Sequence, residues 1–586
     1  MSSRTAIAVI IAVVVTAIVC TTIAWMYYTS IYTMHKAPSP SSSKVHAVPG
    51  TSAPKTVVLH PELVQVWSTP PLIPKSELIK LGVYYRVWTW WTYFQGYVTV
   101  SPDGRYVVVG TVKGQLLIYD AHTGTLVKKF TFPVGYIPRT IRFTPDGKYM
   151  IVGIWSRCGE IAVYNTSTWN EIWHMDLCKF VKGPSNATVE TILREPWLAV
   201  VPYYIVVSPD GKVVYVTIVE RYVNPKTQMV KYYYVKFDLA KIYPEIARKY
   251  HHYIVGVWSG KYWSRIIAID LVRHRVLWTW PRNDTAHVDI PILALSKDGK
   301  YLAAASFWGV DPENPVKWHM GEVWVFNATN GEVLYTFSPL PPIPYINHTS
   351  IWNGLAFADN GKYLIIVTGE GRIVVLNNIE SVRTHRPVKV WSKSVVQFIP
   401  TQAVLIPISG KGTTKVIKTY IYTYAGLAAV TNKYVIVYTG GTYSVGWTPG
   451  YLKRPIRPHP NGTKLFIFDL ATGKLVYIDD FYGMPTYGKV RPFVLAGCYL
   501  VGSVGINWVT EDASLAGIYV WYICGHPYRV TRLLTVQKGL GIPVDVTAHD
   551  SYIYVLTGLV NLATSPTAPA KIVGEYRLIA YKIGIR

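Results

Sequence analysis

Residues 96–130 read GYVTVSPDGRYVVVGTVKGQLLIYDAHTGTLVKKF, and this stretch is the clearest copy of a repeated unit. Apolar runs rich in Val, Leu and Tyr are separated by two turn sequences, Ser-Pro-Asp-Gly at 101–104 and Asp-Ala-His-Thr-Gly at 120–124. An Asp-Gly between apolar runs predicts a tight hairpin, because the turn needs a positive φ that Gly tolerates. The stretch therefore predicts four antiparallel strands in one small sheet.

The same unit recurs along the chain. The turn after the first strand has five clear and three weaker copies, at Asp103-Gly104, Asp146-Gly147, Asp210-Gly211, Asp298-Gly299, Asn360-Gly361, Asn432-Lys433, Gly497-Cys498 and Asp550-Ser551. The turn before the fourth strand recurs at 120–124, 327–331 and 469–473. Such self-similarity indicates a repeat architecture, and four-stranded units repeated radially form a β-propeller. We expect an all-β propeller of eight blades over residues 56–586, or of seven if one weak turn is false.

These units resemble the repeats of the WD40, YVTN and quinoprotein-like propeller families. The stretches SPDGRYVVVG at 101–110 and YDAHTGTLV at 119–127 are close to the family pattern. Trp278 and Trp391, late in their fourth strands, are similar to the tryptophan of the quinoprotein-type repeat. The resemblance implies the fold and no particular activity, since propellers host many unrelated functions.

The last unit ends with a third strand near residue 577, so its fourth strand must come from the other end of the chain. We expect Leu63–Trp67 to supply it, with Tyr85–Trp88 as the alternative. Such closure joins the first and last blades and leaves no long open edge.

The N-terminal residues predict a membrane tether. Residues 6–28 form an uncharged apolar run of 23 residues, long enough to cross a bilayer. We expect a signal anchor at 1–36, with a single transmembrane helix over about 6–28, and a Pro/Ser-rich stalk at 37–55. The first residues also resemble archaeal pilin leaders, so a pilus-type filament subunit or cap is an alternative.

Four cysteines beyond the apolar run predict an oxidising compartment. Cys158 and Cys178 fall at the same end of neighbouring strands, and so do Cys498 and Cys524, so each pair can close a disulfide. Asn-x-Ser/Thr sequons, typical of surface loops in secreted proteins, occur at Asn165, Asn186, Asn283, Asn327, Asn347 and Asn461. We expect a glycoprotein at the cell membrane, single-pass, with the propeller on the extracytoplasmic side and a composition like that of an archaeal surface protein.

The two faces of the predicted propeller differ in their loops. Turns between first and second strands, and between third and fourth, share one face, which we name the tight-turn face. The second-to-third and blade-to-blade connections share the other, the long-loop face, and almost every insertion falls there. Functional residues concentrate on long loops held by a rigid scaffold, so we expect the long-loop face to bind.

Residues just before each first strand are expected to surround the mouth of the central channel. Those that carry ligand-binding chemistry are Arg139, His287, Asp289, His348, Asn353, Arg491 and Asp545. His287 and Asp289 could hold a metal or orient a general base, or they could belong to a satisfied polar ring; no metal site is predicted. Trp88, Trp90 and Trp91 could form an aromatic platform for sugars or belong to the core between blades.

No complete catalytic signature is present: the sequence has no Cys-x-x-Cys-His, His-Glu-x-x-His, Gly-x-Ser-x-Gly or phosphate-cradling loop. The net charge of +25 suits anionic partners, but the charges are scattered, so we expect no nucleic acid. The leading function is a binding or scaffold module for a protein or glycan, such as a surface receptor, adhesin or assembly platform. The alternative is a quinoprotein-like oxidoreductase or glycan-processing enzyme. We predict no cofactor, and quinone or calcium only under that alternative.

Overall fold

The structure is a computed structural model of the chain, which divides into two units, Met1–Val58 and Leu59–Arg586. It describes residues 61–86, 96–230, 232–238, 254–260, 262–282, 288–307, 321–338, 351–369, 371–395, 399–400, 404–407, 414–417, 420–445, 459–483, 492–506, 512–563 and 567–585. All of them belong to the second unit.

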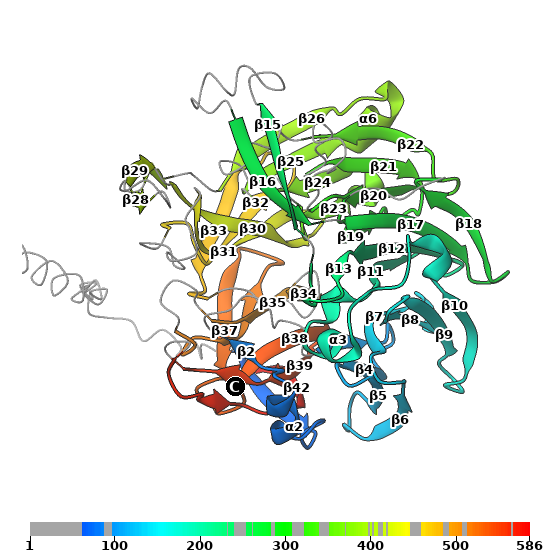
Figure 1. Ribbon diagram of the computed structural model, residues 1–586, viewed down its shortest axis with the longest axis vertical. Helices are drawn as coiled ribbons and strands as arrows, with labels where there is room; N and C mark the ends of the chain where they lie inside the picture. Colours follow the sequence, from blue (N-terminus) through cyan, green and yellow to red (C-terminus); the bar gives the residue numbers. More distant parts are fainter. Residues whose placement is uncertain are drawn as a thin grey trace, which may run out of the picture. The chain divides into compact units, whose positions relative to one another are not determined.

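Eight antiparallel sheets follow one another around a common axis (Figure 1). Blade 1 consists of β3 (Gly96–Val100), β4 (Tyr106–Thr111), β5 (Gln115–Asp120) and β6 (Leu126–Thr131), and blade 2 of β7 (Ile137–Phe143), β8 (Tyr149–Trp155), β9 (Glu160–Asn165) and β10 (Glu171–Asp176). Blade 3 consists of β11 (Val201–Val207), β12 (Val213–Arg221), β17 (Tyr262–Asp270) and β18 (Arg275–Trp280). Blade 4 consists of β19 (Ile292–Leu295), β20 (Tyr301–Ala305), β21 (Val323–Asn327) and β22 (Val333–Phe337).

Blade 5 consists of β23 (Leu355–Ala358), β24 (Tyr363–Val367), β25 (Arg372–Asn377) and β26 (Lys389–Ser394). Blade 6 consists of β30 (Tyr420–Val430), β31 (Tyr434–Val445), β32 (Lys464–Asp469) and β33 (Leu475–Asp480), with the short β27 (Ile399–Pro400) beside β30. Blade 7 consists of β34 (Phe493–Ala496), β35 (Tyr499–Val504), β36 (Gly517–Tyr522) and β37 (Tyr528–Leu534), and blade 8 of β38 (Ile542–His549), β39 (Tyr552–Gly558), β42 (Leu578–Ile585) and β1 (Pro61–Ser68). The first strands contact one another in a closed circle, from β3 through β38 and back to β3. The prediction of eight blades is confirmed.

The repeated turns explain the strand boundaries. In blade 1 the Ser101 hydroxyl donates to the Asp103 carboxylate over 2.6 Å, and the Tyr106 amide donates to the Ser101 hydroxyl over 3.0 Å. Gly104 completes the turn with a φ of +71°. The same hydroxyl–carboxylate contact, also 2.6 Å, recurs in the corresponding turns of blades 2, 3 and 4.

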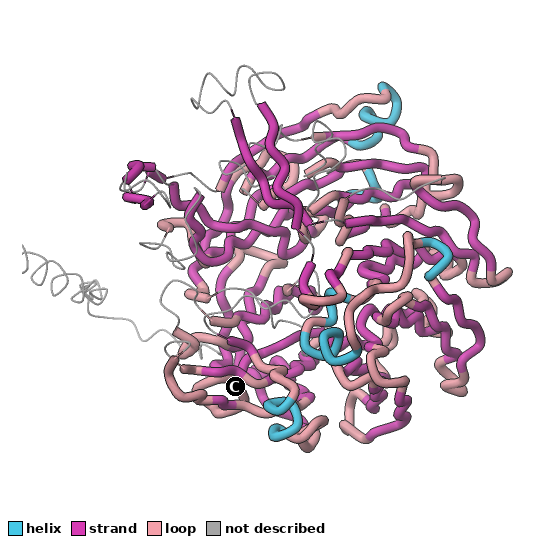
Figure 2. The backbone as a smooth tube through the Cα atoms, in the orientation of Figure 1, coloured by secondary structure: helices cyan, strands magenta, loops and turns pink. Residues whose placement is uncertain are grey.

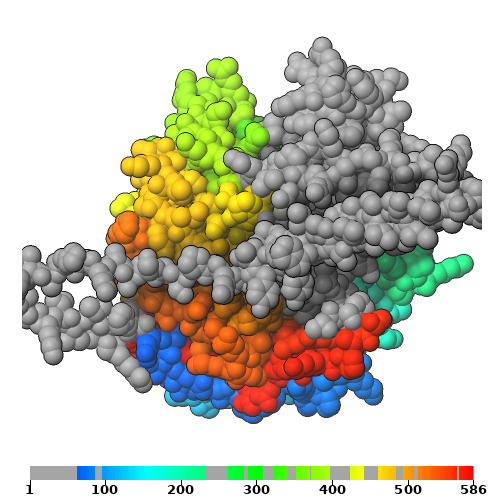
Figure 3. Space-filling view, turned by 90° about the vertical axis from the view of Figure 1, so that its left-hand side faces the viewer, coloured from blue at the N-terminus to red at the C-terminus, as the bar shows by residue number. Residues whose placement is uncertain are grey.

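The ring is closed by its N-terminal strand. β1 pairs antiparallel with β42 from Pro61, opposite Ile585, to Ser68, opposite Ile579. In Figure 3 blue N-terminal residues accordingly lie beside red C-terminal ones. The expected closure by Leu63–Trp67 is confirmed. The alternative was wrong, because β2 (Tyr85–Arg86) pairs in parallel with β40 (Val560–Asn561) instead.

A tryptophan of the outer strand fastens one blade to the next. The Trp67 indole N–H donates to the Ala121 carbonyl over 3.0 Å, and the ring covers Gly124, which has a φ of +72°. A Cβ at Gly124 would lie 2.7 Å from the indole ring, so only glycine allows this approach. Trp278 makes the same contact with the Ala328 carbonyl over 3.0 Å, and Trp391 makes it with that of Leu470 over 2.7 Å. The similarity of these two tryptophans to the quinoprotein-type repeat therefore corresponds to a contact between blades.

The elements outside the blade strands include all the helices, drawn in cyan in Figure 2, and several short strands. The second-to-third and blade-to-blade connections contain α2 (Lys75–Lys80), η1 (Cys178–Phe180), α3 (Val189–Arg194), η2 (Pro196–Leu198), β13 (Val223–Asn224), β14 (Met229–Val230), β15 (Tyr232–Asp238), β16 (Ile254–Gly260), β28 (Val404–Pro407), β29 (Thr414–Ile417) and β41 (Ile572–Val573), besides β2 and β40. The expected concentration of insertions on the long-loop face holds for these elements.

Blade 5 departs from the expected tight turns. The third and fourth strands are joined by α6 (Asn378–Thr384), on the tight-turn face, and η3 (Asp359–Gly361) forms the first turn of this blade. The Asn377 side chain caps the helix by accepting a hydrogen bond from the Glu380 amide, and His385 ends it with a φ of +52°. An Asn followed three residues later by a Glu is a sequence signal for the start of a helix. The repeated turn pattern predicted a tight turn at this place instead.

Among the described residues, no helix is long and apolar enough to cross a membrane. The predicted transmembrane segment at 6–28 and the stalk at 37–55 lie outside these residues, so both stay predictions.

Replacing Trp67 by Ala should destabilise the propeller by roughly 3 kcal/mol, because the substitution removes the packing over Gly124 and the hydrogen bond to Ala121. Val66, 44% exposed on the same strand, provides the control, and Val66→Ala should cost less than about 0.5 kcal/mol. Chemical denaturation of the full chain measures both. Equal effects of the two substitutions would contradict a closing role for Trp67.

Candidate functional site

Four of the seven residues expected at the channel mouth are described: Arg139, Asp289, Asn353 and Asp545. His287, His348 and Arg491, like Trp88, Trp90 and Trp91, lie outside the described residues. The four lie on or just before the inner strands β7, β19, β23 and β38, as expected. All are buried, with exposed fractions of 3% or less. Their contacts are therefore those of the protein interior, and a ligand-binding role stays a prediction.

Asp289 forms a buried ion pair with Arg221, the last residue of β12. The Arg221 Nη2 lies 2.7 Å from the Asp289 Oδ2, and the two side chains are only 4% and 3% exposed. The Arg221 Nη1 donates to the Trp197 carbonyl over 2.8 Å. Burial raises the pKa of Asp289, and the adjacent guanidinium opposes this shift. The pair therefore offsets part of the cost of burying either charge alone.

Aromatic rings enclose the Arg221 guanidinium. Its centre lies 5.5 to 5.6 Å from the ring centres of Trp197, Tyr203 and Tyr262. These contacts are cation–π interactions, which gain strength where water is excluded. The sequence reasoning missed Arg221, because it considered only residues before the first strands and Arg221 ends a second strand.

A second charged group lies across the inner strands of blades 8, 1 and 2. The Arg139 Nη1 donates to the Gly96 carbonyl over 2.8 Å, and its guanidinium stacks on Trp155 at 5.5 Å. Asp545 accepts the Val98 amide on Oδ2 over 2.8 Å. Burial lowers the pKa of Arg139 to about 10, an effect that Asp545 opposes. The two charges therefore stabilise each other electrostatically across the blades.

Tyr203 links the two groups. Burial raises the pKa of this tyrosine, and both Arg221 and Arg139 act on it in the opposite direction. We name the set Asp545, Arg139, Tyr203, Arg221 and Asp289 the polar belt. It crosses blades 8, 2, 3 and 4 and contains two cations and two anions, so it is neutral overall.

Asn353 connects blade 5 to blade 6. It is fully buried, and its amide nitrogen donates to the Tyr438 hydroxyl. Its carbonyl oxygen packs against Gly426, where a side chain would collide with it. The polar side chains at the starts of the inner strands thus contact neighbouring blades. The ring is not fully satisfied, because the Asp289 Oδ1 and the Asn353 Oδ1 are buried without a hydrogen-bond donor among the described residues.

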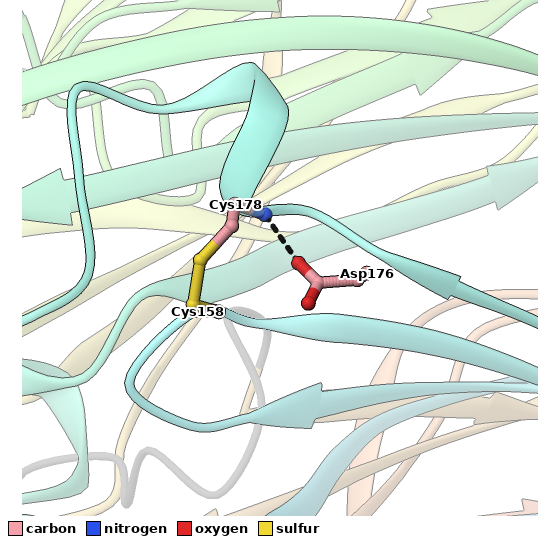
Figure 4. A group of neighbouring side chains, drawn as sticks. All are labelled: Cys158, Asp176 and Cys178. Carbon is pink, nitrogen blue, oxygen red and sulfur yellow. Dashed lines mark hydrogen bonds between the residues drawn. A yellow bond between two sulfur atoms is a disulfide. The ribbon is translucent and has the colours of Figure 1, made fainter.

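Both predicted disulfides are confirmed: Cys158 is bonded to Cys178, and Cys498 to Cys524. The first lies on the long-loop face of blade 2 and the second on the tight-turn face of blade 7. Figure 4 shows Asp176 beside the first bond, its Oδ1 accepting the Cys178 amide over 2.6 Å. These three residues could ligate a metal by proximity, but both sulfur atoms are bonded to each other, and a metal needs free thiolates.

The described sequons differ in how accessible their amide nitrogens are. Asn186 is exposed on the long-loop face. Asn165 and Asn327 are half-buried, and their side-chain oxygens accept turn amides. The Asn461 Nδ2, the atom to which a glycan would be attached, donates to the Val395 carbonyl over 2.8 Å. Asn283 and Asn347 lie outside the described residues.

Glu220, beside Arg221, is a second residue that the sequence reasoning missed. It is 5% exposed, and its Oε2 accepts the Lys182 amide over 2.8 Å. This contact fastens the connection between β10 and β11 to blade 3. Burial raises the pKa of Glu220 to about 7. An acidic residue within an apolar second strand, as in VTIVER at 216–221, was the available signal.

Stability should therefore depend on pH through Glu220. Because its pKa in the folded state lies above the ordinary 4.5, the unfolded chain loses this proton at lower pH than the folded one. The free energy of unfolding of the wild type should fall by about 3 kcal/mol, relative to Glu220→Gln, as pH rises from about 4.5 to above 7. Urea denaturation across this range measures the difference.

Glu190, on α3 of the same connection, is the matched control, because its side chain is 74% exposed. Glu190→Gln should leave the pH dependence of the wild type unchanged. A constant difference between wild type and Glu220→Gln would contradict the burial of a titrating carboxyl.

Comparisons with known proteins give fold similarity only. No protein-family model and no curated protein matches the chain. Among solved structures, the chain is similar to BamB from Moraxella catarrhalis, at 12% identity over 73% of this chain and 83% of that one, with a TM-score of 0.36. It is also similar to the Cps50 (Swd1) β-propeller domain of Myceliophteria thermophila, at 11% identity over 73% and 96%, with a TM-score of 0.36. A chain of the Mitotic Checkpoint Complex matches at 8% identity over 93% and 99%, with a TM-score of 0.38. At these scores the similarities carry no argument about function.

Proposed function

We propose that the chain is a binding platform, a rigid propeller that presents its long-loop face to a protein or glycan partner. The observation that carries the proposal is that the two faces differ: one has tight turns and the other has most of the insertions. The chain enters β1 on the tight-turn face, where Pro61 lies opposite Ile585. Most of the described insertions lie on the opposite face. Loops held by a rigid scaffold are where binding residues concentrate.

The blade 2–3 region supports this interpretation, because its long-loop connection is held in place at several points. The Cys158–Cys178 disulfide fixes one end, and Glu220 holds the Lys182 amide. Gln228, in the turn between β13 and β14, accepts the Thr188 amide over 2.7 Å. A binding surface built this way loses little conformational entropy when a partner docks.

We also propose that residues 6–28 tether the propeller to the cell membrane as a single-pass anchor and that the propeller is extracytoplasmic. The two disulfides support an oxidising compartment. The Pro/Ser-rich residues 37–55 would then act as a stalk to the tight-turn face, and the long-loop face would point away from the membrane.

Cross-linking of the protein in its native membrane with an amine-reactive reagent tests the binding face. Exposed lysines lie on the long-loop face at Lys182, Lys226 and Lys571 and on the tight-turn face at Lys148, Lys212 and Lys300. We expect cross-links to a partner, or protection of lysines by a bound glycan, on the first set. The second set is the internal control, and modification concentrated there would contradict the proposal.

Glycosylation gives an independent test of the outside location. Peptide mass spectrometry of the protein from its own source should find a glycan on Asn186, because this side chain is exposed. Asn461 should be unmodified, because its Nδ2 is engaged with Val395. A glycan on Asn461 with none on Asn186 would contradict this ranking, and an unmodified chain would contradict the glycoprotein proposal.

A further inference from the structure

One inner-strand position breaks the pattern of the repeat. The register of the repeat gives the inner strand of every blade one equivalent residue, which lies opposite the equivalent residue of the second strand. From blade 1 to blade 8 these inner-strand residues are Thr99, Arg142, Val206, Ala294, Ala356, Ala429, Val494 and Thr547. Seven of these eight side chains are small and neutral, and the eighth is a guanidinium. A local departure from a sequence rule of this kind is expected at functional sites.

The neighbours of Arg142 place it on the axial side of the ring. Its guanidinium donates to the hydroxyl of Tyr97, on β3 of blade 1, and its centre lies 5.4 Å from the ring centre of Tyr204, on β11 of blade 3. The inner strands of both adjacent blades therefore flank the side chain. Arg142 is half-buried, so water screens its charge less than at the surface.

Arg142 has donors to spare. Nη1 donates to Tyr97 and, over 2.9 Å, to the Ile141 carbonyl, and the Tyr204 hydroxyl accepts a further bond. A guanidinium offers five N–H groups in a planar fork, so two remain without an acceptor among the described residues.

Arg142 also has no counter-ion among the residues that the structure describes. No carboxylate of the described part of the chain lies within ion-pair distance of it, in contrast to Arg221, which is paired with Asp289. Burial works against its charged form, but Tyr97 and Tyr204 raise the pKa of Arg142, so it stays protonated. A half-buried charge without a counter-ion is costly to the fold, and a bound anion would remove this cost.

We propose that Arg142, with the Tyr204 hydroxyl, forms a binding site for a small free oxyanion, such as phosphate, sulfate or a carboxylate, inside the ring of inner strands. The planar fork of a guanidinium matches the oxygens of such anions in a bidentate arrangement, and the Tyr204 hydroxyl can add an O–H donor. The Tyr97 hydroxyl donates to the Ile141 carbonyl over 3.3 Å and holds Arg142 in place. The site lies on the strands and not on the loops of the binding face, so it is separate from the proposed platform.

Titration calorimetry of the full chain with phosphate, sulfate and acetate tests the site. The wild type should bind at least one of these anions saturably. Arg142→Thr introduces the residue already present at Thr99 and Thr547, so the ring should accommodate it. The variant should bind roughly tenfold to hundredfold more weakly, as expected for the loss of a charge-assisted bidentate contact.

Two further variants keep the result interpretable. Tyr204→Phe removes one hydroxyl, retains the ring and should weaken binding by roughly two- to tenfold, even if Arg142→Thr fails to fold. Arg105→Gln, at a tight-turn side chain that is 68% exposed, should leave binding unchanged. The proposal would be overturned if the wild type bound none of the three anions saturably. It would also be overturned if Arg142→Thr bound them as tightly as the wild type. Should Arg142→Thr not fold, undiminished binding to Tyr204→Phe would have the same meaning. The cross-linking pattern of the long-loop face does not depend on this outcome.

Discussion

The pairing of β1 with β42 is the contact on which the ring depends. It brings together residues from opposite ends of the propeller, as in the hydrogen bond from the Thr69 hydroxyl to the Leu578 carbonyl, 509 positions apart. In each of the other seven blades the outer strand follows the third strand of its own blade in the chain. The cost of closing such a long loop grows only slowly with its length, and the closed ring leaves no open blade edge. Trp67 then fastens blade 8 to blade 1, as Trp278 and Trp391 fasten later blades.

Inside the ring, polarity has a structural use. The polar belt has residues in blades 8, 2, 3 and 4, and its hydrogen bonds also reach β3 of blade 1. Cation–π contacts and one tight ion pair add to these bonds, and the charges of the belt cancel. Isolated buried charges would destabilise the fold, whereas paired and hydrogen-bonded ones specify which blades meet. Arg142 does not belong to this set of paired charges. The residues of the polar belt hold the ring together, whereas Arg142 is the residue proposed to bind a ligand. The ring thus provides the rigid support that the proposed platform on the long-loop face requires.

Much of the fold could be predicted from the sequence because its signals are local. Ser101, Asp103 and Gly104 make a turn by contacts within a few residues, and the same contact recurs in blades 2, 3 and 4. The disulfides were predictable because antiparallel neighbours bring equivalent strand ends together. α6 was missed because its capping residues, Asn377 and Glu380, replace a turn only in blade 5.

The candidate site was harder to predict, because burial and pairing there come from other blades. Asp289 was singled out, but its partner Arg221 is 68 positions earlier and ends a different strand. The register that aligns Arg142 with Thr99 was available from the repeated turns. The absence of a counter-ion among the described residues, in contrast, depends on three blades together. Residues such as His287 and Trp90 lie outside the described residues, so the predictions about them stand as predictions.

The direction of β1 has a mechanical consequence. Its first residue, Pro61, lies on the tight-turn face, and the strand runs from there across the blade to Ser68. Hydrogen bonds between antiparallel strands are perpendicular to the strands. A pull on residue 61 away from that face therefore loads all seven paired positions in shear at once and cannot unzip them one after another. The last blade is therefore oriented to resist a pull on the N-terminal end of β1 away from the tight-turn face.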